Sequence, residues 1–278
     1  MTVIEQPVYR SKLRSALGLM YYGARRRALW VKKSRYFARS FQNEPLPYSC
    51  FMHRTILRRK LKDVDMWMQG NKIINLHLAA KRLNGVIIRP GEVFSYWRLI
   101  GKPSRRRGYV EGMVLQNGKV CSGTGGGLCQ MSNLIFWMAL HTPLTVIERH
   151  RHGHDVFPDS NRTQPFGSGA TCFYPHGDLM LRNDTQDTFQ LLVTVGSEYL
   201  EGEIRASSPP EYRYEIVERD HEMRGEYWGG YTRHNKLYRR QFNAQDELLC
   251  EELVVENDAI MVYSPFLEDG TPSSQESE

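Results

Sequence analysis

The chain has 278 residues, of which 41% are hydrophobic and 24% charged, and it carries a net charge of +6. These values are ordinary for a soluble globular protein and leave room for a sizeable core. Five widely spaced cysteines with no CxxC pair argue against a disulfide framework. No stretch approaches the ~18 apolar residues of a membrane span, and the N-terminus lacks the apolar core of a signal peptide, so we expect a cytoplasmic protein.

The positive charge is concentrated in an N-terminal arm, residues 1–65. From Arg10 to Lys62 there are fifteen Lys or Arg residues and one acid, Glu44. Aromatic residues are interleaved with these bases, as in a helix that lies on an anionic membrane surface, although a solvated basic face is an equally good reading. We expect no nucleic-acid partner, because no recognition motif accompanies the charge. The first reading would make the protein peripheral at the membrane.

The expected elements begin with two helical pieces in the arm, separated by two prolines at 44–47. Apolar residues at helical spacing predict a helix over 71–83, which Asn84 and Gly85 would end. The segments expected next are a strand at 86–88, a turn at 89–92, an extended run at 93–97 and an exposed loop at 102–108.

A hairpin is expected next, because Asn117-Gly118 is a strong turn signal between short strands at 113–115 and 120–122. Residues 128–141 follow a glycine run and are apolar all round except in the first turn. That pattern predicts a buried central helix with only its N-terminus exposed. The strands expected after it are 144–149, continuing through 150–155, and then 170–174, 179–182, 189–195, 212–217, 237–242, 248–255 and 260–263.

These elements predict an α+β fold in which the buried central helix packs on an antiparallel sheet. The last residues, from Glu268 onward, carry four acids and no base, as in a disordered tail. We therefore expect four parts: the basic helical arm at 1–65, a main domain at 66–200, a β-rich C-terminal region at 201–264 and an acidic disordered tail at 265–278.

Cys129 is the strongest single chemical signal, because it stands where the glycine run opens the expected central helix. A helix N-terminus stabilises a thiolate and lowers its pKa, which would make Cys129 a nucleophile. The backbone N–H groups of the glycine turn and the amide of Gln130 could then hold an oxyanion or another ligand group. The turn residues concerned are Gly125, Gly126 and Gly127. The alternative is that Cys129 is a small packed residue and the glycines serve tight packing.

Three histidines follow the central helix, and alternation along a strand would place His150, His152 and His154 on one face. If that strand packs against the helix start, His152 could act as the base for Cys129, with His150 binding ligand. Candidates for a third residue that orients the base are Asp155, Asp178 and Asn183, of which we favour Asp155. A zinc shell and a simple surface cluster are the rival readings of the same histidines.

The glycine run does not match the fingerprints of nucleotide-binding loops. A P-loop needs Gly-Lys-Ser/Thr where this chain has Gly127-Leu128-Cys129, and the dinucleotide pattern needs a glycine where Leu128 stands. Anion binding of another kind stays open. We expect no cofactor and no resident metal.

The motifs, taken in order, resemble those of the VanW family. The resemblance is carried by Asn75 on its helix, the run Arg89-Pro90-Gly91-Glu92-Val93-Phe94-Ser95, Gly108-Tyr109, the element Gly125-Gly126-Gly127-Leu128-Cys129-Gln130 and Glu148-Arg149-His150-Arg151-His152. It covers about residues 71–195. The resemblance implies a context of glycopeptide (vancomycin) resistance or the cell wall, without implying a biochemical activity.

Two functional hypotheses follow from these residues. The first is cysteine-dependent acyl transfer or amide hydrolysis on a peptide-like, cell-wall-related substrate, with Cys129 as nucleophile, His152 as base and Gln130 as oxyanion donor. The second is a non-catalytic module that binds an anionic or peptide-like ligand at the glycine turn while the basic arm docks on the membrane. A metal-dependent reading of the histidines is a third.

Overall fold

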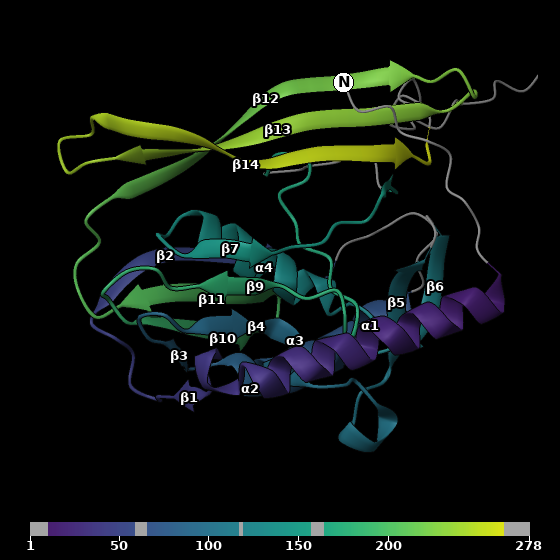
Figure 1. The fold of residues 1–278 in the computed structure, drawn as a ribbon, viewed down its shortest axis with the longest axis horizontal. Helices are drawn as coiled ribbons and strands as arrows, with labels where there is room; N and C mark the ends of the chain where they lie inside the picture. The colour runs from purple at the N-terminus through teal and green to yellow at the C-terminus, as the bar shows by residue number, and fades with distance from the viewer. Residues whose placement is uncertain (1–10, 59–65, 117–118, 157–163, 264–278) are drawn as a thin grey trace, which may run out of the picture.

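Figure 1 shows the chain in a computed structural model that describes residues 11–58, 66–116, 119–156 and 164–263. Within these ranges helices and mostly antiparallel sheets form an α+β fold, which confirms the predicted class. The helices are α1 (Lys12–Lys32), α2 (Met66–Leu83), α3 (Tyr96–Ile100) and α4 (Cys129–Leu140), with 3₁₀ turns η1 (Ser34–Tyr36) and η2 (Arg105–Arg107).

The largest sheet has the strand order β1-β3-β10-β11-β2, and all its neighbouring strands are antiparallel. Its strands are β1 (Ser40–Phe41), β2 (Tyr48–Ile56), β3 (Val86–Ile88), β10 (Phe189–Val195) and β11 (Tyr199–Ala206). Helix α2 packs against β10, and α4 packs against β11 and β2. Helix α4 lies close to β11 at Gly202, where an added Cβ would lie 2.6 Å from Cε of Met138 on the helix.

Helix α4 is the buried central helix that the sequence predicted. Leu134, Ile135, Phe136 and Met138 are almost completely buried. Burial of each such side chain stabilises the fold by about 1.5–3 kcal/mol, so this helix anchors the core. Its first residue, Cys129, is only half-buried.

A smaller sheet packs against α4 through β7, and a hairpin packs against α2 through β5. The sheet has the order β4-β9-β7, and the hairpin pairs β5 with β6. Their strands are β4 (Val93–Ser95), β7 (Thr145–Glu148), β9 (Met180–Arg182), β5 (Glu111–Gln116) and β6 (Lys119–Thr124). The extended run expected at 93–97 ends at Ser95, because its Oγ accepts the N–H of Arg98 and starts α3.

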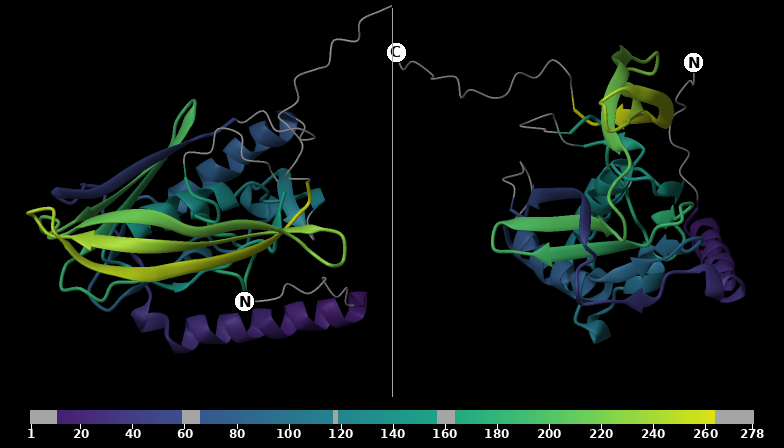
Figure 2. Two further views of the ribbon diagram at one scale, coloured as in Figure 1. Left: turned by 90° about the horizontal axis from the view of Figure 1, so that it is seen from above. Right: turned by 90° about the vertical axis from the view of Figure 1, so that its left-hand side faces the viewer.

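The C-terminal strands form a separate layer above the rest, as Figures 1 and 2 show. Its order is β12-β13-β14-β8, and β8 is the one member that runs parallel to its neighbour. The strands are β12 (Arg213–Gly225), β13 (Tyr231–Phe242), β14 (Leu248–Met261) and β8 (His154–Asp155). The two strands expected at 248–255 and 260–263 are thus one continuous strand.

Several local expectations were wrong where long-range pairing decides the structure. The described part of the second expected helical piece forms β2 instead, which pairs along its length with β11 and belongs to the main sheet. The strand expected at 170–174 is reduced to isolated bridges. Strand β11 was not expected at all. The acidic tail and the turn at 117–118 lie outside the described residues.

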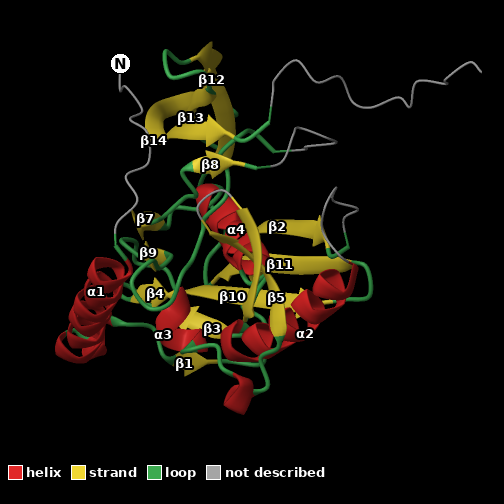
Figure 3. Ribbon diagram, turned by 90° about the vertical axis from the view of Figure 1, so that its right-hand side faces the viewer, coloured by secondary structure: helices red, strands yellow, loops and turns green. Residues whose placement is uncertain are grey.

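Helix α1 lies along one edge of the fold, which Figure 3 shows clearly. Its inner side carries Gly23 against Pro175, with an added Cβ of Gly23 at 3.4 Å from the proline ring. Trp30, further along the same side of the helix, is also buried, and its ring centroid lies 6.2 Å from that of Tyr174. Among the described residues no helix is both long and apolar enough to cross a bilayer.

Candidate functional site

The glycine turn has no open backbone donors. Gly125 and Gly127 have φ of +79° and +87°, where residues with a Cβ are strained. All three N–H groups donate to nearby carbonyls: Gly125 to Val110 at 2.9 Å, Gly126 to Gly123 at 3.0 Å and Gly127 to Met113 at 2.8 Å. The cradle of free N–H groups that we expected here is therefore absent from this turn.

The same turn is packed tightly against its neighbours. A Cβ on Gly126 would overlap the backbone of Gly112, and one on Gly127 would overlap the side chain of Lys72. The amide of Asn75 donates to the carbonyl of Gly126 at 2.9 Å and to that of Val110 at 3.0 Å. These contacts give the glycine run a packing role, which was the alternative reading of the pattern.

Cys129 is the first residue of α4, as predicted, but its thiol is not poised as a thiolate. The Sγ atom lies 3.8 Å from the carbonyl oxygen of Cys172, to which it donates. Burial raises the pKa of the Cys129 thiol, and hydrogen bonds to the backbone offset only part of that effect. The direction is opposite to the lowered pKa that the helix N-terminus alone would suggest.

The amide of Gln130 is already bonded within the protein. Its Nε2 donates to Oγ1 of Thr55 at 2.9 Å and to the carbonyl of Ile56 at 2.9 Å. Both amide hydrogens therefore hold the end of β2, and neither points at a reacting group beside Cys129.

The histidines do not lie on one strand face. Only His154 and Asp155 are in a strand, β8, while His150 forms an isolated bridge with Thr171. His152 is half-buried, and burial together with the charge of Arg151 and the neighbouring His154 lowers its pKa. In the described part of the chain no three metal-binding side chains gather in one cluster.

Asp155 belongs to the C-terminal layer, so it does not orient a base at Cys129. It is buried, and its Oδ2 accepts from the hydroxyl of Tyr263 at 2.8 Å. The same oxygen lies 3.3 Å from Nη1 of Arg233. Asn183, another candidate, donates to the carbonyls of Ile88 and Asp187 and thus holds a turn.

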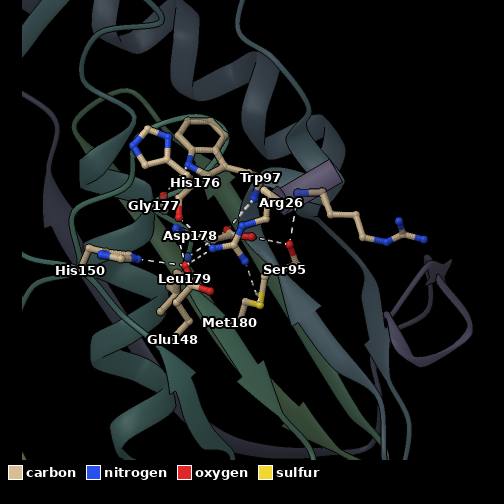
Figure 4. Close-up of polar contacts among 11 residues, drawn as sticks. Arg26, Ser95, Trp97, Glu148, His150, His176, Gly177, Asp178, Leu179 and Met180 are labelled. Atoms are coloured by element: carbon tan, nitrogen blue, oxygen red, sulfur yellow. Dashed lines mark hydrogen bonds and ion pairs between the residues drawn. The ribbon is translucent and has the colours of Figure 1, made fainter. Parts of the chain in front are cut away.

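A cluster of polar side chains centres instead on Glu148, at the end of β7 (Figure 4). Its Oε1 accepts from Nε2 of His150 at 2.9 Å, from the backbone N–H of Asp178 at 3.0 Å and from the guanidinium of Arg26. Burial alone would raise the pKa of Glu148, but the hydrogen bonds from His150 and Arg26 outweigh it and the pKa is lowered. Glu148 is therefore an ionised carboxylate at neutral pH.

Next to Glu148 is a surface that we call the histidine face: His150, Phe173 and His176. The ring centroid of Phe173 lies 5.2 Å from that of His150 and 4.9 Å from that of His176. The side chain of His150 is 36% exposed and Phe173 is 41% exposed. Burial, together with the nearby His150 and Arg26, lowers the pKa of His176. His150 and Phe173 are thus partly exposed to solvent, whereas the N–H groups of the glycine turn are bonded within the protein.

Below the histidine face lies Asp178, which is completely buried. Its carboxylate accepts from Oγ of Ser95 at 2.5 Å, and from the N–H groups of Trp97 and Leu179 at 2.9 Å each. Burial raises the pKa of Asp178 to about 7 despite the hydrogen bonds from Ser95 and Trp97. The group caps α3 and supports the loop that carries His176.

One short segment joins the two candidate centres. Thr171 donates its N–H to the carbonyl of His150 at 2.8 Å, and the next residue, Cys172, accepts the thiol of Cys129. Cys129 and His150 thus contact consecutive residues of the same segment.

Comparison with known proteins identifies the family. Residues 71–205 match the family described as "VanW like protein". Over 181 residues the chain is 42% identical to the "Vancomycin B-type resistance protein VanW" of Enterococcus faecalis, a match that covers 65% of this chain and 66% of that protein. The chain belongs to the VanW family. It is also 30% identical to the "Uncharacterized protein YoaR" of Bacillus subtilis over 109 residues, 39% of this chain and 34% of that protein.

No solved structure matches this VanW-family chain. Its match spans just under two thirds of the length of the Enterococcus relative. The matched region contains Glu148, His150 and Asp178, whereas Arg26 lies before it.

The sequence analysis did not predict that Glu148 is the centre of a polar cluster, although the sequence contains a signal for it. Glu148 and His150 are two residues apart at the end of a predicted strand, a spacing that places two side chains on one face. The contribution of Arg26 had no such signal, because it lies 122 residues away from Glu148 in the chain.

Proposed function

We propose that this VanW-family chain is an accessory protein of glycopeptide resistance that binds a peptide-like, cell-wall-related ligand at the histidine face. The resistance context follows from the name of the Enterococcus relative and from the family membership. The binding role is proposed in preference to thiol chemistry, because the thiol of Cys129 and the amide of Gln130 are both engaged within the protein.

The observation that carries the proposal is the orientation of His150. An ionised carboxylate only accepts hydrogen bonds, so Nε2 of His150 must carry the hydrogen that points to Glu148. In the neutral imidazole Nδ1 is then an acceptor, and it has no hydrogen-bond partner among the described residues. A half-exposed histidine with a fixed ring and a free acceptor is suited to receive an N–H group from a ligand.

The surroundings of His150 indicate the rest of the ligand chemistry. Phe173 offers an exposed aromatic surface beside the imidazole, and Tyr22 of α1 lies close to His176, with ring centroids 6.2 Å apart. A ligand that combines an N–H donor with an apolar side chain matches this combination of an acceptor and aromatic walls. Peptides have both features.

The test is calorimetric titration of the full-length chain with a synthetic peptidoglycan stem pentapeptide. His150→Gln removes the Nδ1 acceptor, and we expect it to weaken binding about tenfold or more, the equivalent of one lost hydrogen bond of about 1.4 kcal/mol. The matched control is His77→Gln, which changes an exposed histidine on α2 and should bind as the wild type does. No binding by the wild type, or equal binding by both variants, would contradict the proposal.

A second candidate is cysteine-dependent acyl transfer, favoured by the position of Cys129 as first residue of α4. It requires a reactive thiolate near neutral pH, with His152 as the base. Site-specific alkylation, followed across pH by mass spectrometry, separates the two candidates. Because burial raises the thiol pKa, we expect Cys129 to react with a midpoint above the free value of ~8.5. A midpoint below ~7.5, with exposed Cys250 as internal reference, would support the enzyme instead.

A further inference from the structure

Helix α1 presents an apolar stripe to solvent. Successive residues of an α-helix turn by about 100°, so residues three, four, seven and eight apart share one side. Five large apolar residues fall within one such arc and are strongly exposed: Leu13 (72%), Leu17 (57%), Met20 (70%), Tyr21 (63%) and Val31 (76%). Exposed Ala24 and Ala28 continue the arc between them. We call these seven residues the outer stripe.

The opposite side of α1 is fixed to the protein. Gly23, Arg26 and Trp30 follow one another at three- and four-residue spacing and make the contacts with the body. Nη2 of Arg26 donates to the carbonyl of His176 at 2.8 Å and pairs with Glu148, and Arg98 donates to the carbonyl of Trp30 at 3.4 Å. These contacts set the rotation of the helix, so the outer stripe faces away from the body.

Positive charges border the stripe on both edges. Because successive residues turn by about 100°, Arg27 lies along one edge of the stripe. Arg14, Arg25 and Lys32 lie along the other edge. Of these four residues, Lys32 alone is in the last turn of the helix. These four side chains are exposed, and α1 contains no acidic residue. Long basic side chains on both edges of an apolar stripe can reach phosphates while the stripe enters an apolar layer.

We propose that α1 is an in-plane membrane anchor, which docks on a bilayer of anionic lipid with the outer stripe in the boundary between headgroups and acyl chains. The charge complementarity selects this occupant, since a bilayer offers phosphates on both sides of a helix that lies in its surface. The helix has 21 residues, so the stripe runs for about 30 Å. The inference does not depend on any ligand at the histidine face.

The test uses flotation of the full-length chain with two kinds of vesicle, phosphatidylcholine alone and phosphatidylcholine with phosphatidylglycerol. We expect binding to the anionic vesicles and a loss of binding at high salt, which screens the basic edges. Leu17→Glu places a charge in the outer stripe and should reduce the partition coefficient about tenfold or more.

A matched control exists in the same helix. Leu19 is exposed to the same extent as Leu17, 57%, but lies about 200° further round the helix, outside the outer stripe. Leu19→Glu should therefore retain binding within about twofold, and circular dichroism of both variants confirms an intact fold. Failure of the wild type to bind anionic vesicles, or an equal loss in both variants, overturns the proposal. Binding that is equal on neutral and anionic vesicles also overturns it.

Discussion

Asp178→Ala is expected to lower the free energy of unfolding by about 3–5 kcal/mol. The substitution leaves three donors in the buried interior without an acceptor, those of Ser95, Trp97 and Leu179, and each such loss costs about 1–3 kcal/mol. Asp178→Asn is the matched control, because it keeps an acceptor for the two backbone N–H groups and a polar group beside Ser95. Urea unfolding at pH 7 measures both variants. Equal stability of the alanine variant and the wild type would contradict the support role of Asp178.

The same residue predicts how stability depends on pH. The pKa of Asp178 is raised to about 7 in the folded chain, so between pH ~4 and ~7 the folded state binds a proton that the unfolded state has lost. This group therefore contributes stability below its unfolded pKa, and the contribution is lost as the pH rises towards 7. Asp178→Asn removes the effect, so the difference in stability between the variant and the wild type should shift by roughly 4 kcal/mol in favour of the variant over that range. A constant difference would show that Asp178 titrates normally.

Gly126→Ala is expected to destabilise the fold by about 3 kcal/mol or more. A methyl group there would overlap the carbonyl of Gly112, and backbone on both sides cannot move without breaking the hydrogen bonds of the turn. Gly70→Ala is the control: an added Cβ meets nothing within 4 Å, and the site is in α2, so the variant should gain about 0.5–1 kcal/mol. Thermal unfolding of both variants checks the pair. A Gly126 variant as stable as the wild type would restore the reading of the turn as an open ligand loop.

The parts of the fold that sequence could predict are those fixed by local interactions. Helix α4 was predicted within about a residue at each end, because its apolar run and its preceding glycines are contiguous. The end of α2 at Leu83 followed from Gly85, whose φ of +82° suits a helix stop. The hairpin of β5 and β6 was recognised from its turn residues.

The parts that could not be predicted depend on partners far away in the chain. Strand β2 pairs with β11, as in Tyr48 with Ala206, and no pattern within residues 48–56 announces that partner. Considered without β11, these residues form a basic segment with scattered apolar residues, for which we predicted a helix. The prediction of one continuous strand through the histidines was wrong for the same reason, because His150 bridges to Thr171 while His154 pairs with β14.

The sequence predicted the region of the candidate site, but not the roles of the residues within it. The sequence placed chemistry around Cys129 and the histidines, and of these Cys129 and His150 do contact neighbouring residues of one segment, Cys172 and Thr171. Burial, which a sequence does not display, reversed the expected shift in the pKa of the Cys129 thiol. Arg26 and the loop of His176 reached Glu148 only through tertiary packing.

Binding of the stem pentapeptide by Cys129→Ser and His150→Gln, compared by calorimetry at one pH, tests the proposed role of the histidine face most directly. We expect Cys129→Ser to bind within about twofold of the wild type, because serine can keep the hydrogen bond to the carbonyl of Cys172. His150→Gln should bind about tenfold more weakly or worse. The reverse result, binding lost with Cys129→Ser and retained with His150→Gln, would contradict recognition at the histidine face and return the function to the thiol.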